Sequence, residues 1–143
     1  MMRRWGSSLL LAGFALLGAG VELFRDAPVA ALVVFVVLGG AAVAVSPRAF
    51  PRSVTDALAR ERSAADGRAI VYWRPGCPFC LRLRASLGRD ARRLHWVDIW
   101  SDPAGAATVR AATGGDETVP TVVFAGEAHV NPAPARVRAM ATR

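Results

Sequence analysis

The sequence predicts an α/β domain of order βαβαββα that follows a two-helix transmembrane hairpin. Two long apolar segments lie at the N-terminus, and a segment rich in Pro, Ser and Arg follows them. From residue 68 onward, short β-branched runs alternate with helical patterns. These observations divide the chain into a hairpin at residues 1–46, a juxtamembrane linker helix at 47–67 and an α/β domain at 68–143.

The composition favours a membrane segment. The chain has 143 residues, of which 53% are hydrophobic, and its mean hydropathy is +0.31. It is too short for two ordinary soluble domains and too apolar for one. No charged residue occurs from Trp5 to Val21 or from Pro28 to Val45. We therefore expect spans at about 5–24 and 28–45, each close to the roughly 20 residues that cross a bilayer.

The first apolar segment also has features of a signal peptide, because Arg3 and Arg4 precede it and small residues at 18–20 offer a cleavage point. The apolar run is long for such a peptide, which favours the hairpin. Arginines precede the first span and follow the second, whereas the loop holds only Arg25 beside Asp26. This distribution predicts a cytoplasmic membrane protein whose termini and α/β domain face the cytoplasm. A cleaved signal peptide followed by one span would leave the domain on the same side.

The linker carries the signals of a short helix. Ser53 followed by Asp56 is typical of an N-cap with an acidic first turn, and Gly67 is typical of a C-cap. Arginines of this helix are expected either to contact anionic lipid headgroups or to form a solvated face.

The elements of the domain follow from the apolar pattern. Residues 70–73 form a β-branched and aromatic run that reaches a turn at Pro75-Gly76, and helical spacing begins at Cys80. The remaining elements are expected as a strand at 94–100, a helix at 103–113, a strand at 121–124, a hairpin connection at 125–127, a strand at 128–130 and a helix from 132 or 133 to 140.

The chemistry is expected at Cys77 and Cys80, the two cysteines of the chain. Cys77 lies at the start of the predicted helix, where free N–H groups and the helix dipole stabilise a thiolate, and Cys80 lies one turn deeper. Pro78 suits the first turn, and the cation of Arg74 should lower the pKa of Cys77 further. The pair supplies an exposed nucleophile and a buried resolving thiol.

Other interpretations of these features are weaker. A zinc site needs more ligands than two cysteines and the isolated His95 and His129 provide, so we expect no metal. A structural disulfide across so short a loop would add little stability. The net charge of +7 suggests nucleic acid, but the arginines after Cys80 fall on the polar face of a helix without interleaved aromatic residues, so we expect no nucleic-acid partner.

The segment Y-W-R-P-G-C-P-F-C at residues 72–80 resembles the active site of glutaredoxins, and Thr118-Val119-Pro120 resembles their second signature. Residues 114–132 are most similar to mycoredoxins, which are glutaredoxin-like proteins of bacteria that use mycothiol. The resemblance covers residues 68–143 and implies a thioredoxin-like fold in which the Val119–Pro120 bond is cis.

The resemblance further implies a thiol–disulfide oxidoreductase that needs no cofactor. It would reduce mixed disulfides between client proteins and a low-molecular-weight thiol, and the similarity to mycoredoxins favours mycothiol as that thiol. Its catalytic residues would be Cys77 and Cys80. Its expected partners are those clients, the thiol and membrane lipid. The implied substrate-binding residues are Arg74, Pro78, Phe79, Thr118, Val119 and Pro120.

Two other functions stay open at this stage. One is a redoxin that thioredoxin reductase reduces directly, although the C-terminal Trp-Ser-Gly-Phe signature of such redoxins is absent from the sequence. The other is a non-catalytic module in which Cys77 of two chains bridges an iron–sulfur cluster. Two features argue against this module. The chain has a second cysteine, Cys80, and it has Pro78 at a position where cluster-carrying relatives usually have Gly.

Overall fold

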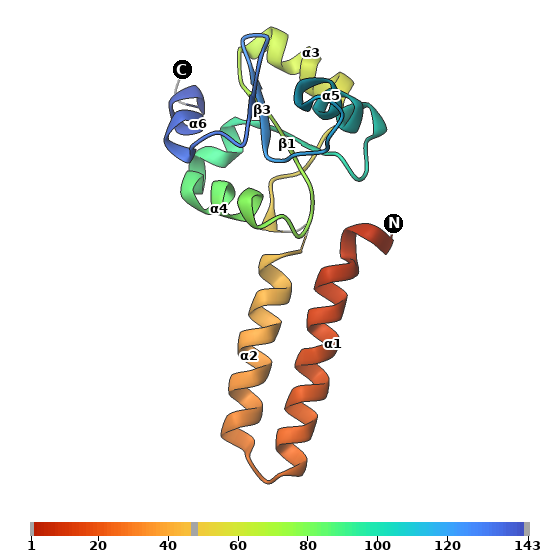
Figure 1. The fold of residues 1–143 in the computed structure, drawn as a ribbon. Coiled ribbons are helices and arrows are strands. Elements are labelled where there is room, and N and C mark those ends of the chain that lie inside the picture. The colour runs from red at the N-terminus through yellow and green to blue at the C-terminus, as the bar shows by residue number, and fades with distance from the viewer. Residues whose placement is uncertain (1, 47–48, 142–143) are drawn as a thin grey trace. The chain divides into compact units, whose positions relative to one another are not determined.

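The computed structural model describes residues 2–46 and 49–141, and the chain divides into two compact units, 1–49 and 50–143 (Figure 1). Five residues lie outside the described part of the chain. They are residue 1 of the predicted hairpin, residues 47–48 of the predicted linker and residues 142–143 of the predicted domain.

The first unit is a pair of packed helices, α1 (Met2–Phe24) and α2 (Pro28–Ala44). The packing is close, because a Cβ on Gly18 would lie 2.9 Å from Cγ1 of Val34. Large apolar side chains of both helices point outward; for example, Leu17 is 70% exposed and Val29 is 75% exposed. Such an apolar surface needs an apolar environment.

The helices of this unit differ in their capacity to cross a bilayer. Residues Trp5–Phe24 of α1 form a helix long and apolar enough to do so. Helix α2 has 17 residues, so at about 1.5 Å per residue it is shorter than a hydrocarbon core of about 30 Å. One span is therefore compatible with the structure by length and composition, while two spans and their orientation stay predictions.

Helix α3 (Asp56–Asp66) begins two residues later than the sequence pattern suggests. Its N-cap is Thr55, whose Oγ1 accepts a hydrogen bond from the Leu58 N–H at 3.3 Å. The expected cap, Ser53, instead accepts from Nε1 of Trp73 at 2.9 Å and forms an isolated parallel bridge with Trp96. The helix ends at Gly67, as expected, with a φ of 70°.

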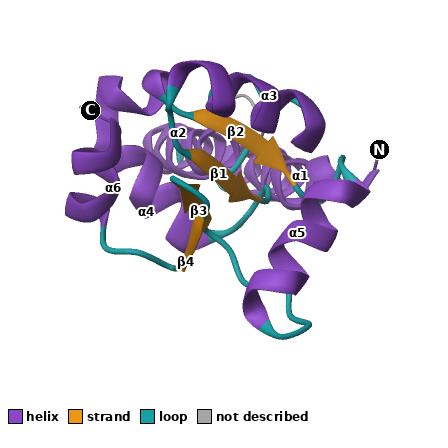
Figure 2. Cartoon of the chain, turned by 90° about the horizontal axis from the view of Figure 1, so that it is seen from above, coloured by secondary structure: helices purple, strands orange, loops and turns teal. Residues whose placement is uncertain are grey.

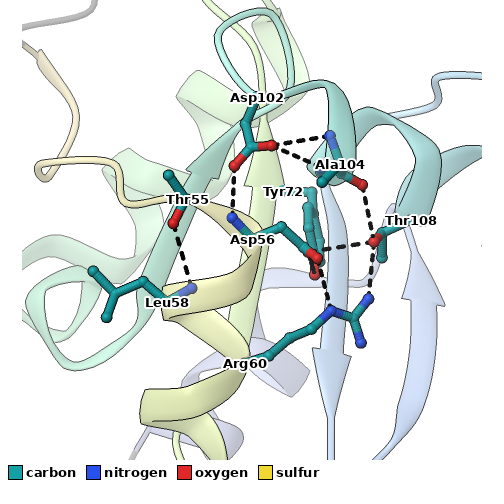
Figure 3. A network of polar contacts seen from close by, with 9 residues as sticks. Thr55, Asp56, Leu58, Arg60, Tyr72, Asp102, Ala104 and Thr108 are labelled. Atoms are coloured by element: carbon teal, nitrogen blue, oxygen red, sulfur yellow. Dashed lines mark hydrogen bonds and ion pairs between the residues drawn. The ribbon is translucent and has the colours of Figure 1, made fainter.

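This helix, which the sequence pattern suggests is a linker, lies within the second unit and packs on the sheet and on α5 (Pro103–Thr113). The buried Asp56 carboxylate accepts hydrogen bonds from the Tyr72 hydroxyl at 2.6 Å, Arg60 Nε at 2.8 Å and the Thr108 hydroxyl at 3.3 Å (Figure 3). The Asp102 carboxylate accepts from the Asp56 N–H at 2.6 Å while it caps α5. These contacts bind α3 to a strand and to a second helix.

The sheet contains strands in the order β2-β1-β3-β4. Strand β1 (Ile70–Trp73) pairs in parallel with β2 (His95–Asp98) and antiparallel with β3 (Thr121–Phe124), which pairs antiparallel with β4 (Glu127–Val130). The first two strands are buried along their whole length, because helices cover both faces of the sheet. The strand that the sequence predicts at 94–100 is shorter in the structure, where β2 spans His95–Asp98. The strand predicted at 128–130 is one residue longer, because β4 begins at Glu127.

Helices cover the two faces of the sheet in pairs. Helix α4 (Pro78–Leu87) packs with α6 (Pro134–Ala141) on one face, and α3 packs with α5 on the other (Figure 2). A 3-10 helix, η2 (Gly88–Arg93), which the sequence pattern does not predict, extends α4 toward β2. The described order from β1 onward is βαβαββα with this added turn, which is the thioredoxin-like arrangement.

An aromatic cluster joins the segment before α3 to the sheet. Phe50 stacks on Trp73 with ring centroids 3.8 Å apart, and its ring meets Trp96 edge-on at 5.7 Å. All three side chains are buried. The core of the second unit therefore includes a residue that lies 18 positions before the predicted domain boundary at 68.

Candidate functional site

Cys77 is the N-cap of α4. Strand β1 ends at Trp73, Gly76 turns the chain with a φ of 75°, and Pro78 occupies the first helical turn, where its missing N–H needs no partner. The Cys77 Sγ accepts a hydrogen bond from the Cys80 N–H at 3.3 Å. The local sequence thus places a sulfur at a helix N-terminus.

The surroundings of Cys77 favour its thiolate. Its pKa falls from an ordinary value near 9 to about 6, chiefly because the Cys80 thiol donates a hydrogen bond to it. Backbone N–H groups of Cys80 and Phe79 and the charge of Arg74 act in the same direction, whereas burial opposes them. Donors that stabilise the anion are what an attacking thiol needs near neutral pH.

Cys80 has the opposite character. Its pKa is raised because its thiol is the hydrogen-bond donor to Cys77 and because burial disfavours its charge. Cys80 is fully buried, and Cys77 is also buried with 5% of its surface exposed, so the expectation of an exposed nucleophile at Cys77 is wrong for this structure. Both cysteines are free thiols in this structure. The pair therefore combines a ready nucleophile with a thiol that stays protonated until the first sulfur has reacted.

The second predicted motif lies against the cysteines. In its protonated form the Cys77 thiol donates to the Val119 carbonyl at 3.4 Å, and the Val119–Pro120 peptide bond is cis, as the resemblance implies. The Thr118 carbonyl accepts from the Thr121 hydroxyl at 2.8 Å, and the Pro120 carbonyl accepts from the Asn131 N–H at 2.8 Å. These bonds hold the loop before β3 beside the sulfur of Cys77.

The other predicted residues surround the pair at different depths. Arg74 is half-buried, and its guanidinium carbon lies 5.8 Å from the centre of the Trp100 ring. Pro78 and the Thr118 side chain are exposed, and Phe79 is 55% exposed. The structure gives no contact of the Thr118 side chain with either cysteine, so its proposed role rests on the backbone.

A groove next to the cysteine helix combines Phe79, a predicted substrate-binding residue, with residues that the sequence analysis does not single out. It has a volume of about 240 Å³ and is lined on one side by Phe79, Arg82 and Leu83 of α4. Its other side is the loop from Asn131 to Pro134, where Asn131 has a positive φ of 45°. The closely spaced Asn-Pro-Ala-Pro of this loop was the available sequence signal.

Three further aromatic or titratable residues are placed by the structure. Trp73 is buried in the core, so it does not form substrate surface. Trp100 is half-buried beside Arg74 at the rim. The His95 ring is buried and lies 3.0 Å from the Asp66 carboxylate, which agrees with a structural role. Among residues 2–46 and 49–141, no group of three or more His, Cys, Asp or Glu side chains is arranged to hold a metal.

Comparison with known proteins points to one family. The family model named Glutaredoxin matches residues 69–130. Two relatives, each named "Putative glutaredoxin", come from Mycobacterium tuberculosis strains CDC 1551 / Oshkosh and H37Rv. Each is 39% identical to this chain over 70 residues, which are 48% of this chain and 83% of the relative. The match contains both cysteines and the loop with the cis bond.

Proposed function

This chain belongs to the glutaredoxin family and is a thiol–disulfide oxidoreductase, and from this premise we propose that it is a membrane-anchored enzyme that reduces mixed disulfides between proteins and a low-molecular-weight thiol. Mycothiol is the proposed thiol, because residues 114–132 are most similar to mycoredoxins. The proposed clients are cytoplasmic proteins that carry such a disulfide.

The reaction consists of thiol–disulfide exchanges. The Cys77 thiolate attacks the sulfur of the small thiol in the mixed disulfide, so that a new S–S bond forms and the client leaves as a thiolate that takes up a proton. A second small thiol then attacks the adduct, releases the oxidised dimer of the small thiol and regenerates Cys77. Alternatively, the Cys80 thiol loses its proton and attacks Cys77, which releases the small thiol and leaves a Cys77–Cys80 disulfide that a reductant must reopen. Each exchange occurs between sulfur atoms, so we propose no cofactor besides the thiol.

The observation that carries this proposal is the asymmetry of the two sulfurs. The pKa of Cys77 is about 6, whereas that of Cys80 is raised, and one hydrogen bond between the thiols contributes to both changes. At pH 7 a pKa of about 6 leaves about 90% of Cys77 as thiolate. The Cys80 thiol can lose its proton once Cys77 is in a disulfide and its charge is gone.

The residues around Cys77 suggest how a substrate is held. We propose that the backbone at Val119 and Pro120 pairs with an extended substrate, while Arg74, Pro78 and Phe79 form the surface over which the small thiol lies. Thr118 contributes through its carbonyl, which fixes the loop. The groove between Phe79 and Pro132 would receive the part of the substrate beyond its sulfur.

Membrane anchoring is supported by the first unit. Helix α1 has the length and composition to cross a bilayer, and the exposed apolar side chains of both helices would face lipid. We propose two spans with the redox domain in the cytoplasm, because arginines flank both ends of the hairpin and the loop holds one arginine beside an aspartate. Lipid is accordingly a proposed partner.

A reductase assay with a mixed-disulfide substrate tests the proposal. The full chain should turn over with mycothiol, and more slowly or not at all with glutathione or with thioredoxin reductase. Cys80→Ser should keep activity on mixed disulfides, because a free thiol resolves the adduct, and should lose activity on disulfides within a protein. Turnover supported by thioredoxin reductase alone would contradict the proposed reductant.

A further inference from the structure

A second pocket lies away from the cysteines. It has a volume of about 380 Å³ and is walled by the segment before α3, by α3 and by the outer edge of β2. Four arginines line it: Arg52, Arg62, Arg68 and Arg92, hereafter the arginine pocket. Arg68 and His95 mark the start of β1 and β2, whereas Cys77 follows the end of β1. The pocket and the cysteines therefore lie toward opposite ends of the strands.

The charge of the arginine pocket is largely uncompensated. Within the described part of the chain, no carboxylate lies within ion-pair distance of Arg52, Arg62 or Arg92. Arg68 pairs with Asp66, whose carboxylate lies 3.6 Å from Arg68 Nε and 3.0 Å from His95 Nε2. Several guanidinium groups that line one pocket without carboxylate partners among the described residues, as Arg52, Arg62 and Arg92 do, offer the donors that bind phosphate.

The position of the pocket in the chain favours a membrane lipid as the source of that phosphate. Arg52 lies eight positions after Ala44, where α2 ends, so a fully extended connection reaches at most about 28 Å. Anchoring of the hairpin would thus tether Arg52 within about 28 Å of the end of α2, which allows the pocket to reach the bilayer surface. Each arginine near an anionic membrane surface raises the affinity for that surface about fivefold. This attraction decays within a Debye length of about 8 Å at physiological salt.

We propose that the arginine pocket binds the phosphate of an anionic phospholipid headgroup and thereby fixes the redox domain against the membrane. This inference rests on the membrane anchor of the proposed function. A lipid bound there would touch Pro51 and the edge of β2 while the other end of the strands, with Cys77, stays free for clients.

Hydrogen exchange of the full chain in lipid nanodiscs tests this inference. Discs of phosphatidylcholine are compared with discs that also contain phosphatidylglycerol, and backbone exchange is followed at residues 51–54 and 92–96. Exchange there should slow in the anionic discs, and added salt should remove the effect. The double variant Arg52→Gln/Arg92→Gln should bind the anionic surface about 30-fold more weakly and should lose the protection. The double variant Arg89→Gln/Arg136→Gln has the same charge change outside the pocket and should keep the protection.

The remaining outcomes separate the sources of the phosphate. Equal exchange in both kinds of disc, or equal loss in the two double variants, would overturn the inference. Protection in phosphatidylcholine discs by inorganic phosphate, or by single-stranded DNA, would assign the pocket to a soluble anion instead and would also overturn it. Release of the chain from membranes by alkaline carbonate would refute the anchor and this inference together, whereas retention with unchanged exchange would refute this inference alone.

Discussion

Removing the Cys80 thiol should raise the pKa of Cys77. The hydrogen bond from Cys80 is the largest cause of the low pKa of about 6, and Cys80→Ala removes this donor while it leaves the backbone N–H groups and Arg74 in place. A hydrogen bond to a charged group is worth about 1.5–3 kcal/mol. That corresponds to about one to two pKa units, so the pKa of Cys77 should move to about 7–8.

The reaction rate at a single pH would hide this shift. If the pKa rises to about 7, the thiolate fraction at pH 7 falls from about 90% to about 50%. The intrinsic nucleophilicity of the thiolate rises about threefold over the same unit, so the two effects oppose each other and the rate at pH 7 changes by less than about twofold. The informative quantity is therefore the midpoint of the pH profile of alkylation.

The assay is the rate of iodoacetamide alkylation of Cys77 between pH 4 and pH 9. Cys80→Ser is the matched control, because its hydroxyl can still donate and should shift the midpoint by less than about one unit. A midpoint that is unchanged in Cys80→Ala would refute the role of the inter-thiol hydrogen bond. An equal shift in both variants would assign the effect to burial or packing instead.

Four further predictions concern stability and topology. Asp56→Asn should destabilise the second unit by roughly 2–3 kcal/mol, because it weakens the hydrogen bonds that the Asp56 carboxylate accepts from Tyr72, Arg60 and Thr108. An unchanged free energy of unfolding in chemical denaturation would show that these bonds do not stabilise the fold. Burial raises the pKa of Asp56, but hydrogen bonds from Tyr72, Arg60 and Thr108 and the charge of Arg60 together outweigh it, so the pKa is lowered. The stability that Asp56 adds is therefore present above about pH 4 and is lost as the pH falls through its lower folded pKa; a pH series in which wild type and variant lose stability in parallel would contradict this. A fragment of residues 50–143 should fold, whereas 68–143 should not, because the shorter one lacks Phe50, Ser53 and all of α3; a cooperative unfolding transition for 68–143 would contradict the packing. Membrane-impermeant thiol reagents should label Cys77 only after cells are opened, and labelling in intact cells would reverse the proposed orientation.

The sequence predicts the parts of the fold that local patterns specify. The run from Ile70 to Trp73, the turn at Pro75-Gly76 and the cysteine at the helix start are all where the pattern places them. Gly67 ends α3 with a positive φ, as expected from its position, and Gly114 ends α5 in the same way. In each case the signal lies within a few residues of the feature that it predicts.

Long-range contacts explain most of the differences. Ser53 has a good capping side chain, but a hydrogen bond from Trp73, 20 positions later, occupies it, and Thr55 caps α3 instead. Phe50 and Asp56 are isolated in a polar segment, so no periodicity reveals that one stacks on Trp73 and the other binds Tyr72. The linker therefore proves to be part of the domain only when the sheet is assembled.

The candidate site divides in the same way. The position of Cys77 and its thiolate character follow from the helix start, which is a local feature. The hydrogen bond to the Val119 carbonyl and the groove at Asn131–Pro134 depend on loops that are more than 40 positions away. The family resemblance supplied the first of these loops, and spacing alone did not.

Trapping the reaction intermediate tests the central claim most directly. Cys80→Ser is mixed with a protein that carries a mycothiol mixed disulfide, the reaction is stopped with acid, and the mass of each cysteine peptide is measured. The account predicts a mycothiol adduct on Cys77 together with the free thiol of the client, and no adduct when Cys77→Ser is used. Release of the client thiol without an adduct on Cys77, or turnover by Cys77→Ser, would contradict it.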